Sequence, residues 1–321
     1  MSKTPELVES SLLSPTQAPS TRRRNFRSSA LAMLVASIPV IFIAIFVGIP
    51  ALMAVAFSLG YTGGPNATVS LLDQSLVSTD HGITFTVYAH LLSDPSFLSD
   101  FWATIWVTLA SVALILLVGW CLALYLRFSQ GKLVHILSSL YLVPLFIPVV
   151  IASYAIVTFW NAHGYVSALV QNILHLPFDG FGYTLFGVVL GQLWVNIPFS
   201  VLLLASGLRN VPDALIESAR DVGASFPTIL LRIIIPLNML PTIIVATFTG
   251  IGVLGSFTIP YLTGPNAPTL LGVAMARYFQ AFNEPQQAAA MAVLVFILAA
   301  GLGAVYIWAN VSSHRKAGAT Q

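Results

Sequence analysis

The chain has 321 residues, of which 57% are hydrophobic and only 7% are charged, and its formal net charge is +2. A soluble domain of this size needs many more charged side chains to cover its surface, so the composition excludes that class and indicates an integral membrane protein. The lone cysteine, Cys121, lies within an apolar run and excludes an internal disulfide.

The N-terminal segment, residues 1–29, is rich in Ser, Thr and Pro and is predicted to be a disordered cytoplasmic tail. Its triplet Arg22–Arg23–Arg24 faintly resembles a twin-arginine export signal. A signal peptide has an apolar region of about 7–15 residues, and the run that follows these arginines is nearly twice that length. We therefore interpret the run as a retained helix that the arginines anchor on the cytoplasmic side.

Six apolar segments are long enough to cross a bilayer core of roughly 30 Å, which takes about 20 helical residues. Their centres contain no Asp, Glu, Lys or Arg, while residues such as Pro198, Gly250 and Gly252 predict kinks and close helix packing. We predict an all-α membrane protein with one transmembrane domain over 30–309 and a cytoplasmic tail over 310–321. The predicted spans are 30–57, 102–126, 136–160, 184–207, 233–257 and 287–308.

Basic residues are distributed unequally between the two sides of these spans. The segments before span one, between spans two and three, between four and five, and after six hold 5, 2, 3 and 2 Lys or Arg. Only Arg277 falls on the other side. The positive-inside rule therefore predicts that both termini are cytoplasmic.

Three loops are predicted on the extracytoplasmic side. In 58–101, the Ser93–Asp94–Pro95 turn and the Ser99–Asp100 pair both look like helix-start signals. Residues 161–183 are predicted to include a short surface helix that ends near Pro177. Residues 258–286 are rich in Pro and Gly and are compatible with a loop that dips back toward the membrane.

Residues 210–232 form a charged cytoplasmic segment in which we predict two short helices. Asn210 can cap the start of the first helix, and Pro212 suits its first turn. The predicted polar face holds Asp213, Glu217, Arg220 and Asp221, and the predicted apolar side holds Leu215, Ile216, Ala219 and Val222.

Gly223 fits the left-handed residue that closes such a helix. Ser225 and Pro227 then start the second helix, which runs toward the membrane with Pro236 at its bend. Two helices set at an angle would present a charged knuckle to the cytosol. An interfacial amphipathic loop with no partner is the alternative interpretation.

The pattern Glu217–Ser218–Ala219, three residues, Gly223, nine residues, Ile233–Ile234–Ile235–Pro236 resembles the EAA signature of ATP-binding-cassette (ABC) importer permeases. That signature reads Glu-Ala-Ala, three residues, Gly, nine residues, Ile-x-Leu-Pro. Ser218 and Ile235 depart from it mildly and keep its spacing. The resemblance extends over roughly residues 85–315.

The resemblance implies a type I importer permease with six transmembrane helices, in the inner membrane of a prokaryotic cell. The EAA loop would be the coupling helix that docks on a separate ATPase. The implied coupling residues are Glu217, Ser218, Ala219, Asp221, Gly223 and Pro236. The implied partners are ABC ATPase subunits, a second permease that is homologous or identical, and an extracytoplasmic solute-binding protein, with membrane lipid around the spans and no nucleic acid.

Two features of the sequence also suggest that a separate subunit supplies the energy for transport. Intramembrane ionisable groups mark proton-coupled carriers, and the span centres have none. A phosphate-cradling loop is also missing, because Gly131–Lys132 is followed by Leu133 where Ser or Thr is required. We expect no cofactor in this chain, with ATP and Mg²⁺ bound by the partner ATPase. A sodium-coupled carrier or a channel that needs no ATP remains the alternative.

Catalytic and metal sites are not predicted. The six histidines are scattered and lack a metal-like spacing such as H-E-x-x-H, and no Gly-x-Ser-x-Gly elbow occurs. The spans hold neutral polar groups such as Gln192, Asn196 and Asn238, which more often bond between helices than react. An enzyme or a membrane scaffold is the third alternative.

The transport route should lie where helices are broken and where polar or aromatic groups converge. The candidate pathway residues are Trp160, Trp194, Asn196, Asn238, Ser256, Phe257 and Tyr261. Ordinary interfacial aromatics and helix packing are the alternative interpretation for each of them.

Within the family, the Val222–Gly223–Ala224 turn and the run 257–266 resemble spermidine/putrescine-type permeases most. We therefore expect a polyamine-like cargo or a related small solute. The spans hold no carboxylate for a polycation, so the partner permease or the outer loops would have to provide one. Importers of iron, thiamine, opines and aminophosphonates share similar turns and stay open as alternatives.

Overall fold

The computed structural model describes residues 26–78 and 83–318, and every regular element among them is helical. The chain divides into two compact units, residues 1–52 and 53–321. By length and composition, five helices can cross a membrane, or six if one bent pair counts as a single span. The all-helical fold with up to six spans is therefore confirmed.

The first unit holds a broken apolar helix. Helix α1 (Phe26–Ile43) contains Pro39, a π-helical turn η1 (Ala44–Gly48) follows, and α2 (Ile49–Ser58) continues into the second unit. Helix α1 begins four residues before the predicted start of the first span, so 26–29 are helical, where a disordered tail was predicted. Residues 1–25 of that tail lie outside the described part.

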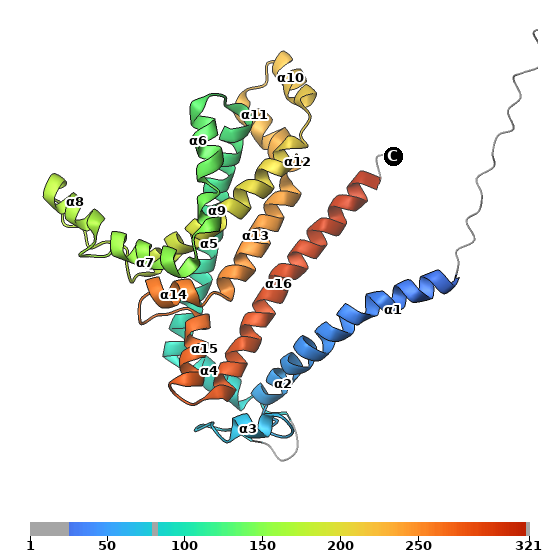
Figure 1. Ribbon diagram of the computed structural model, residues 1–321, viewed down its shortest axis with the longest axis vertical. Helices are drawn as coiled ribbons and strands as arrows, with labels where there is room; N and C mark the ends of the chain where they lie inside the picture. The colour runs from blue at the N-terminus through green and yellow to red at the C-terminus, as the bar shows by residue number, and fades with distance from the viewer. Residues whose placement is uncertain (1–25, 79–82, 319–321) are drawn as a thin grey trace, which may run out of the picture. The chain divides into compact units, whose positions relative to one another are not determined.

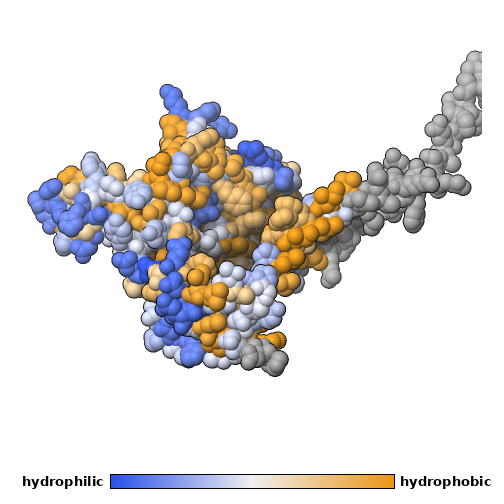
Figure 2. Space-filling view, turned by 60° about the horizontal axis from the view of Figure 1, so that its bottom comes forward, coloured by the Kyte–Doolittle hydropathy of each residue, from blue (hydrophilic) through white to orange (hydrophobic). Residues whose placement is uncertain are grey.

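In the second unit, four long helices run between two ends (Figure 1). They are α5 (Pro95–Phe128), α9 (Leu185–Arg209), α13 (Met239–Leu254) and α16 (Pro285–Gly318). Helix α10 (Asp213–Asp221) lies at one end, and the other end holds α3 (Asn66–Ser70), α4 (Thr86–Ser93) and α15 (Leu271–Gln280). Hydrophilic side chains gather over the second of these ends (Figure 2).

Helix α5 is longer than the predicted span because it begins at Asp94–Pro95. The Asp94 carboxylate accepts a hydrogen bond from the Ser96 backbone N–H at 2.9 Å, which caps the helix as expected. The second predicted start signal, Ser99–Asp100, is wrong, since both residues lie inside α5. Asp100 instead accepts the backbone N–H of Thr269 at 2.7 Å and so holds the segment before α15.

The third predicted span, 136–160, is not one helix. It divides into α6 (Lys132–Leu140), a 3₁₀ turn η2 (Val143–Phe146) and α7 (Val149–Trp160). Pro144 and Pro148 cause the break, because each lacks a backbone N–H and clashes with a continuing helix. The candidate span here is Val149–Leu174, in which a short turn joins α7 to α8 (Tyr165–Leu174). Helix α8 ends at Leu174, within the segment 161–183 where a short surface helix was predicted, but it belongs to this candidate span.

The fifth predicted span, 233–257, is bent by 68° at Asn238. Before the bend lie α11 (Phe226–Ile229), a π-helical turn η3 (Leu230–Ile234) and α12 (Ile235–Leu237). Pro236 and Pro241 flank the bend and remove two backbone donors. The last helix, α16, extends to Gly318, which is beyond the predicted end of the sixth span at residue 308 and inside the predicted C-terminal tail. Residues 319–321 lie outside the described part.

The predicted loop over 258–286 contains α14 (Thr258–Thr263) and α15. Helix α14 packs against α7 and α9, and Ile259 and Thr263 are buried there. A side chain at Gly191 of α9 would come within 2.5 Å of Ile259, so the glycine is what lets α14 approach. This loop therefore folds back among the long helices.

Three hydrophobic clusters lie along α5. Phe97 belongs to the cluster near α4 and α15, Val107 to a middle cluster with α9 and α14, and Ile115 to a cluster near α10. Helix α5 therefore links both ends of the second unit, with α9 as its most extensive neighbour.

Helix α9 packs tightly against the bend and the start of α13 at Gly207. A Cβ atom there would lie 1.8 Å from Asn238 Oδ1 and 2.6 Å from Pro241 Cγ. Gly252 of α13 differs, because nothing lies within 4 Å of the corresponding position. The close packing predicted from glycines therefore holds for Gly250, whose Cβ would come 2.9 Å from Leu302, but not for Gly252.

We predict that Gly207→Ala lowers the apparent melting temperature of the protein in detergent, because overpacking at such a contact costs about 1–3 kcal/mol. The matched variant Gly252→Ala should leave the melting temperature unchanged or raise it slightly, since alanine is the better helix former. Equal melting temperatures for the two variants would contradict the close approach at Asn238.

Candidate functional site: a helical knuckle at one end of the bundle

The knuckle, residues 210–232, begins where α9 ends. Asn210 closes α9 with a backbone N–H bond to the Gly207 carbonyl at 3.1 Å, so its predicted role as the cap of the next helix is wrong. Pro212 has an extended backbone and takes the N-cap position of α10. Asp213 places a negative charge in the first turn and Arg220 a positive charge in the last turn, and both charges interact favourably with the helix dipole.

Gly223 closes α10 as predicted. Its φ of 81° lies in the left-handed region, and its N–H bonds to the Arg220 carbonyl at 2.8 Å. The N–H of Ala224 reaches the Ala219 carbonyl at 3.0 Å, which completes a Schellman-type end. The chain then turns at Ser225, the residue before α11, whose hydroxyl lies 2.9 Å from that of Thr228.

Only part of the predicted apolar side of α10 is buried. Ile216 is 5% exposed and lies in the cluster near α10 together with Ala123 of α5, while Ala219 packs against the same cluster. Leu215 and Val222, which belong to the same predicted apolar side, stay 45% and 84% exposed. One face of a helix this short cannot bury all four side chains against the ends of α5 and α9.

The outer surface of α10 therefore exposes both polar and apolar side chains. Glu217, Ser218 and Asp221 are exposed beside the apolar Leu215 and Val222. Apolar side chains with charged neighbours on a small, rigid helix are typical of a protein-binding surface. Pro236 is exposed two residues before the bend at Asn238.

Two contacts join this knuckle to the end of α5. The Arg127 guanidinium forms an ion pair with the Asp213 carboxylate, and Phe128 meets the Phe226 ring edge-on with centroids 5.9 Å apart. The Arg127 guanidinium also lies 5.7 Å from the Phe128 ring centroid. Sequence reasoning missed Arg127 as a partner, although a basic residue at the end of an uncharged span was the available signal.

The structure brings some of the candidate pathway residues together. Gln192 of α9 donates to the Ser256 hydroxyl at 2.8 Å, and Asn196 one turn later donates to the Gln192 carbonyl at 2.8 Å. The exposed rings of Phe257 and Tyr261 stack beside Ser256, with centroids 5.1 Å apart and planes 18° apart. The start of α14 thus offers an exposed aromatic surface next to a polar patch on α9.

The other three candidates have different surroundings. Asn238 is fully buried and donates to the Leu204 carbonyl at 3.2 Å, so it bonds α9 to the bend. Trp160 ends α7, where its ring lies 5.8 Å from that of Phe181. The Trp194 indole N–H is buried and has no hydrogen-bond partner among the described residues.

Within residues 26–78 and 83–318, no group of three or more His, Cys, Asp or Glu side chains is placed to hold a metal ion. The knuckle exposes charged and apolar side chains and packs against the ends of α5 and α9.

Comparisons with known proteins identify a family and several similar permeases. Residues 115–318 match the family described as binding-protein-dependent transport system inner membrane component. The xylose/arabinose import permease protein XacH of Haloferax volcanii is 27% identical over 81% of this chain and 85% of its own length. The spermidine/putrescine transport system permease protein PotB of Escherichia coli is 26% identical over 70% of this chain and 82% of its own.

The fold has a match among solved structures as well. A chain of a bacterial ABC transporter involved in the import of the acidic polysaccharide alginate aligns with a TM-score of 0.68 at 17% identity, covering 90% of this chain and 96% of that one. The chain therefore belongs to the family of binding-protein-dependent transport system inner membrane components, and it is a multi-pass inner membrane permease subunit of an ABC importer rather than an enzyme.

Proposed function

We propose that α10, the Gly223 turn and α11 form the element through which a separate ATPase subunit drives this permease. The observation that carries the proposal is the two-sided character of α10. Its outer face exposes Glu217, Ser218 and Val222, while its inner face buries Ile216 among the ends of α5 and α9. A partner that binds the outer face of α10 and moves it must also move the buried face.

The proposed transmission is mechanical. Protein interiors are packed as densely as organic crystals, so a shift of Ile216 is passed to its neighbours rather than absorbed. Ala123 and Leu208 belong to the same cluster, which ties α10 to α5 and α9. The knuckle joins α13 through the bend at Asn238, and the Asn238 bond to the Leu204 carbonyl keeps that bend against α9.

The proposed assembly contains three kinds of partner. A second permease, identical or homologous, completes the pathway; ATPase subunits bind ATP and Mg²⁺; and an extracytoplasmic binding protein delivers the cargo. The family description and a relative in the alginate importer, crystallised in complex with a ligand-bound periplasmic protein, support this arrangement. We propose a cytoplasmic location for α10 and both termini, because 12 of 13 basic residues lie on that side of the spans.

The proposed cargo is a small polar solute, with polyamines as the first candidate. PotB and the Val222–Gly223–Ala224 turn support a polyamine. XacH supports a pentose as the second candidate. The stacked Phe257 and Tyr261 rings suit either class, since aromatic faces bind both cations and apolar sugar faces.

We predict that Gly223→Val abolishes ATP-driven uptake while the protein still reaches the membrane. A valine at φ 81° is strained by about 1–2 kcal/mol, which favours a different end for α10. The matched control is Gly131→Val, which has φ 117°, open space around it, and lies outside the knuckle. Uptake and stimulated ATPase activity in proteoliposomes check the prediction; full coupling in Gly223→Val would contradict it.

We further predict that Arg127→Ala and Asp213→Ala each lower uptake per ATP hydrolysed, and that the double variant is no worse than either single one. The ion pair is partly exposed, with side-chain exposures of 26% and 66%, so its loss should change stability by only about 0–1 kcal/mol. A double-mutant cycle on the coupling ratio tests this. Additive losses would show that the two residues act independently.

Cargo is tested by uptake of labelled spermidine, putrescine, xylose and arabinose into cells that express the complete transporter. We expect saturable, ATP-dependent polyamine uptake that an excess of unlabelled pentose does not reduce. Pentose uptake with no polyamine uptake would overturn the polyamine proposal and leave the coupling proposal intact.

A further inference from the structure

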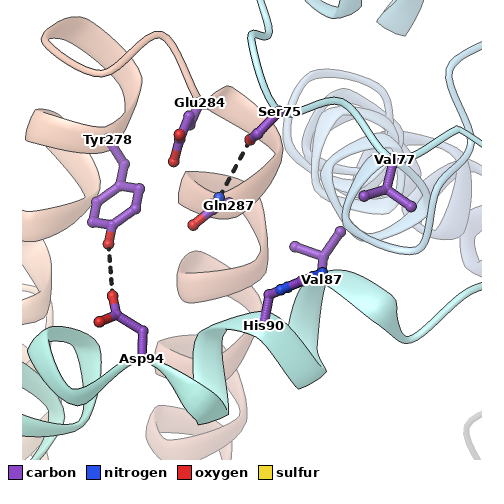
Figure 3. Close-up of a pocket in the computed structure, with 8 residues that line it drawn as sticks. All are labelled: Ser75, Val77, Val87, His90, Asp94, Tyr278, Glu284 and Gln287. Atoms are coloured by element: carbon purple, nitrogen blue, oxygen red, sulfur yellow. Dashed lines mark hydrogen bonds between the residues drawn. The ribbon is translucent and has the colours of Figure 1, made fainter.

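A cavity of about 370 Å³ lies at the end of the second unit opposite α10 (Figure 3). Its walls come from α4, the cap of α5, α15, the start of α16 and the segment before α4. This volume falls in the range of small-molecule sites, about 300–1,000 Å³. The lining residues are Ser75, Val77, Val87, His90, Asp94, Tyr278, Glu284 and Gln287.

Glu284 contributes a carboxylate that forms no ion pair with any of the described residues. It is partly buried, and the ion pair found among residues 26–78 and 83–318 is the one between Arg127 and Asp213, at the other end of the unit. Burial raises the pKa of Glu284, and the nearby Asp73 raises it further. A cation held in this cavity would offset both of these costs.

Asp94 contributes a second carboxylate, which is held in place. Its Oδ1 accepts the Ser96 N–H at 2.9 Å, and its Oδ2 accepts the Tyr278 hydroxyl at 3.1 Å. Burial, and then Asp94 itself, raises the pKa of Tyr278 to about 12, so the hydroxyl stays a neutral donor. The Tyr278 hydroxyl points toward Asp94, and the Glu284 side chain lies near the other end of Tyr278 (Figure 3).

The other lining groups suit an organic cation better than a metal ion. Val77 and Val87 provide an apolar wall, and Gln287 and Ser75 provide neutral polar atoms joined by a 3.3 Å hydrogen bond. In the described part of the chain, no three metal-ligating side chains are grouped here or elsewhere. The basic Arg277 lines the neighbouring cavity, where it donates to the Asn266 carbonyl at 2.7 Å.

We propose that this cavity binds a small organic amine. One ammonium group would pair with Glu284, a second would reach Asp94, and the methylene chain would lie against the Tyr278 ring and the two valines. Charge-assisted hydrogen bonds to the carboxylates and a cation–π contact would supply the affinity. The proposal rests on the proposed function in taking this end as extracytoplasmic, and it supplies the carboxylates for a polyamine that the spans lack.

The test measures equilibrium binding of labelled putrescine and spermidine to the complete transporter in nanodiscs, without nucleotide or binding protein. We expect Glu284→Gln to weaken binding about tenfold or more, the size of effect that corresponds to one lost charge-assisted contact. Asp179→Asn removes an exposed acid from another loop and should have no effect. Gln287→Glu adds a carboxylate to the cavity wall and should tighten binding.

Four outcomes would overturn the proposal: no amine binding, equal affinity in the wild type and Glu284→Gln, competition by butane-1,4-diol as strong as by putrescine, or displacement by Ca²⁺ at equal concentration. Failure here is distinguishable from failure of the proposed cargo. Amine binding that depends on Glu284 would stand even if pentoses were transported. Polyamine uptake that is unchanged in Glu284→Gln, with unchanged binding, would leave only the cargo proposal standing.

Discussion

Because Ile216 lies in one hydrophobic cluster with residues of α5, α9 and the segment before the bend, α10 cannot shift without displacing the ends of the long helices. This burial gives the charged surface of α10 a mechanical consequence. An isolated helix of nine residues would be marginal in water, so α10 also depends on this packing to stay helical. Gly223 and Pro212 limit its length, and a short helix fixed at both ends is a stiffer lever than a loop.

Helix α5 extends the same constraint across the second unit. It contributes Ile115 to the cluster near α10, Val107 to the middle cluster beside α14, and Phe97 to the cluster near the cavity that Glu284 lines. The middle cluster also contains Ile259, two residues from Phe257 and Tyr261. Dense packing along a single helix is therefore the physical connection between the knuckle and the aromatic surface that we propose for cargo.

Sequence reasoning located the spans because long uncharged apolar runs leave few other structures open to the chain, and it located Gly223 because the left-handed region favours glycine. It failed at 136–160, where hydropathy is insensitive to the breaks that Pro144 and Pro148 impose. The helical pattern also cannot tell that Leu215 and Val222 stay exposed while Ile216 is buried, since which part of the apolar side is covered depends on where α5 and α9 end. The Arg127–Asp213 ion pair joins residues 86 positions apart, and the Tyr278–Asp94 hydrogen bond in the wall of the Glu284 cavity joins residues 184 positions apart, so no local sequence pattern encodes either contact.

The distribution of charge also separates the two ends of the second unit. Charged side chains lie at the two ends of the second unit, with Arg127 and Asp213 near α10 and Asp94 and Glu284 at the opposite end. The predicted spans between them hold none. Solvent-exposed charges farther apart than a Debye length of about 8 Å are largely screened, so one end cannot act on the other electrostatically. In the mechanism that we propose, each end binds its own partner, and packing along α5 and α9 carries the coupling between the two ends.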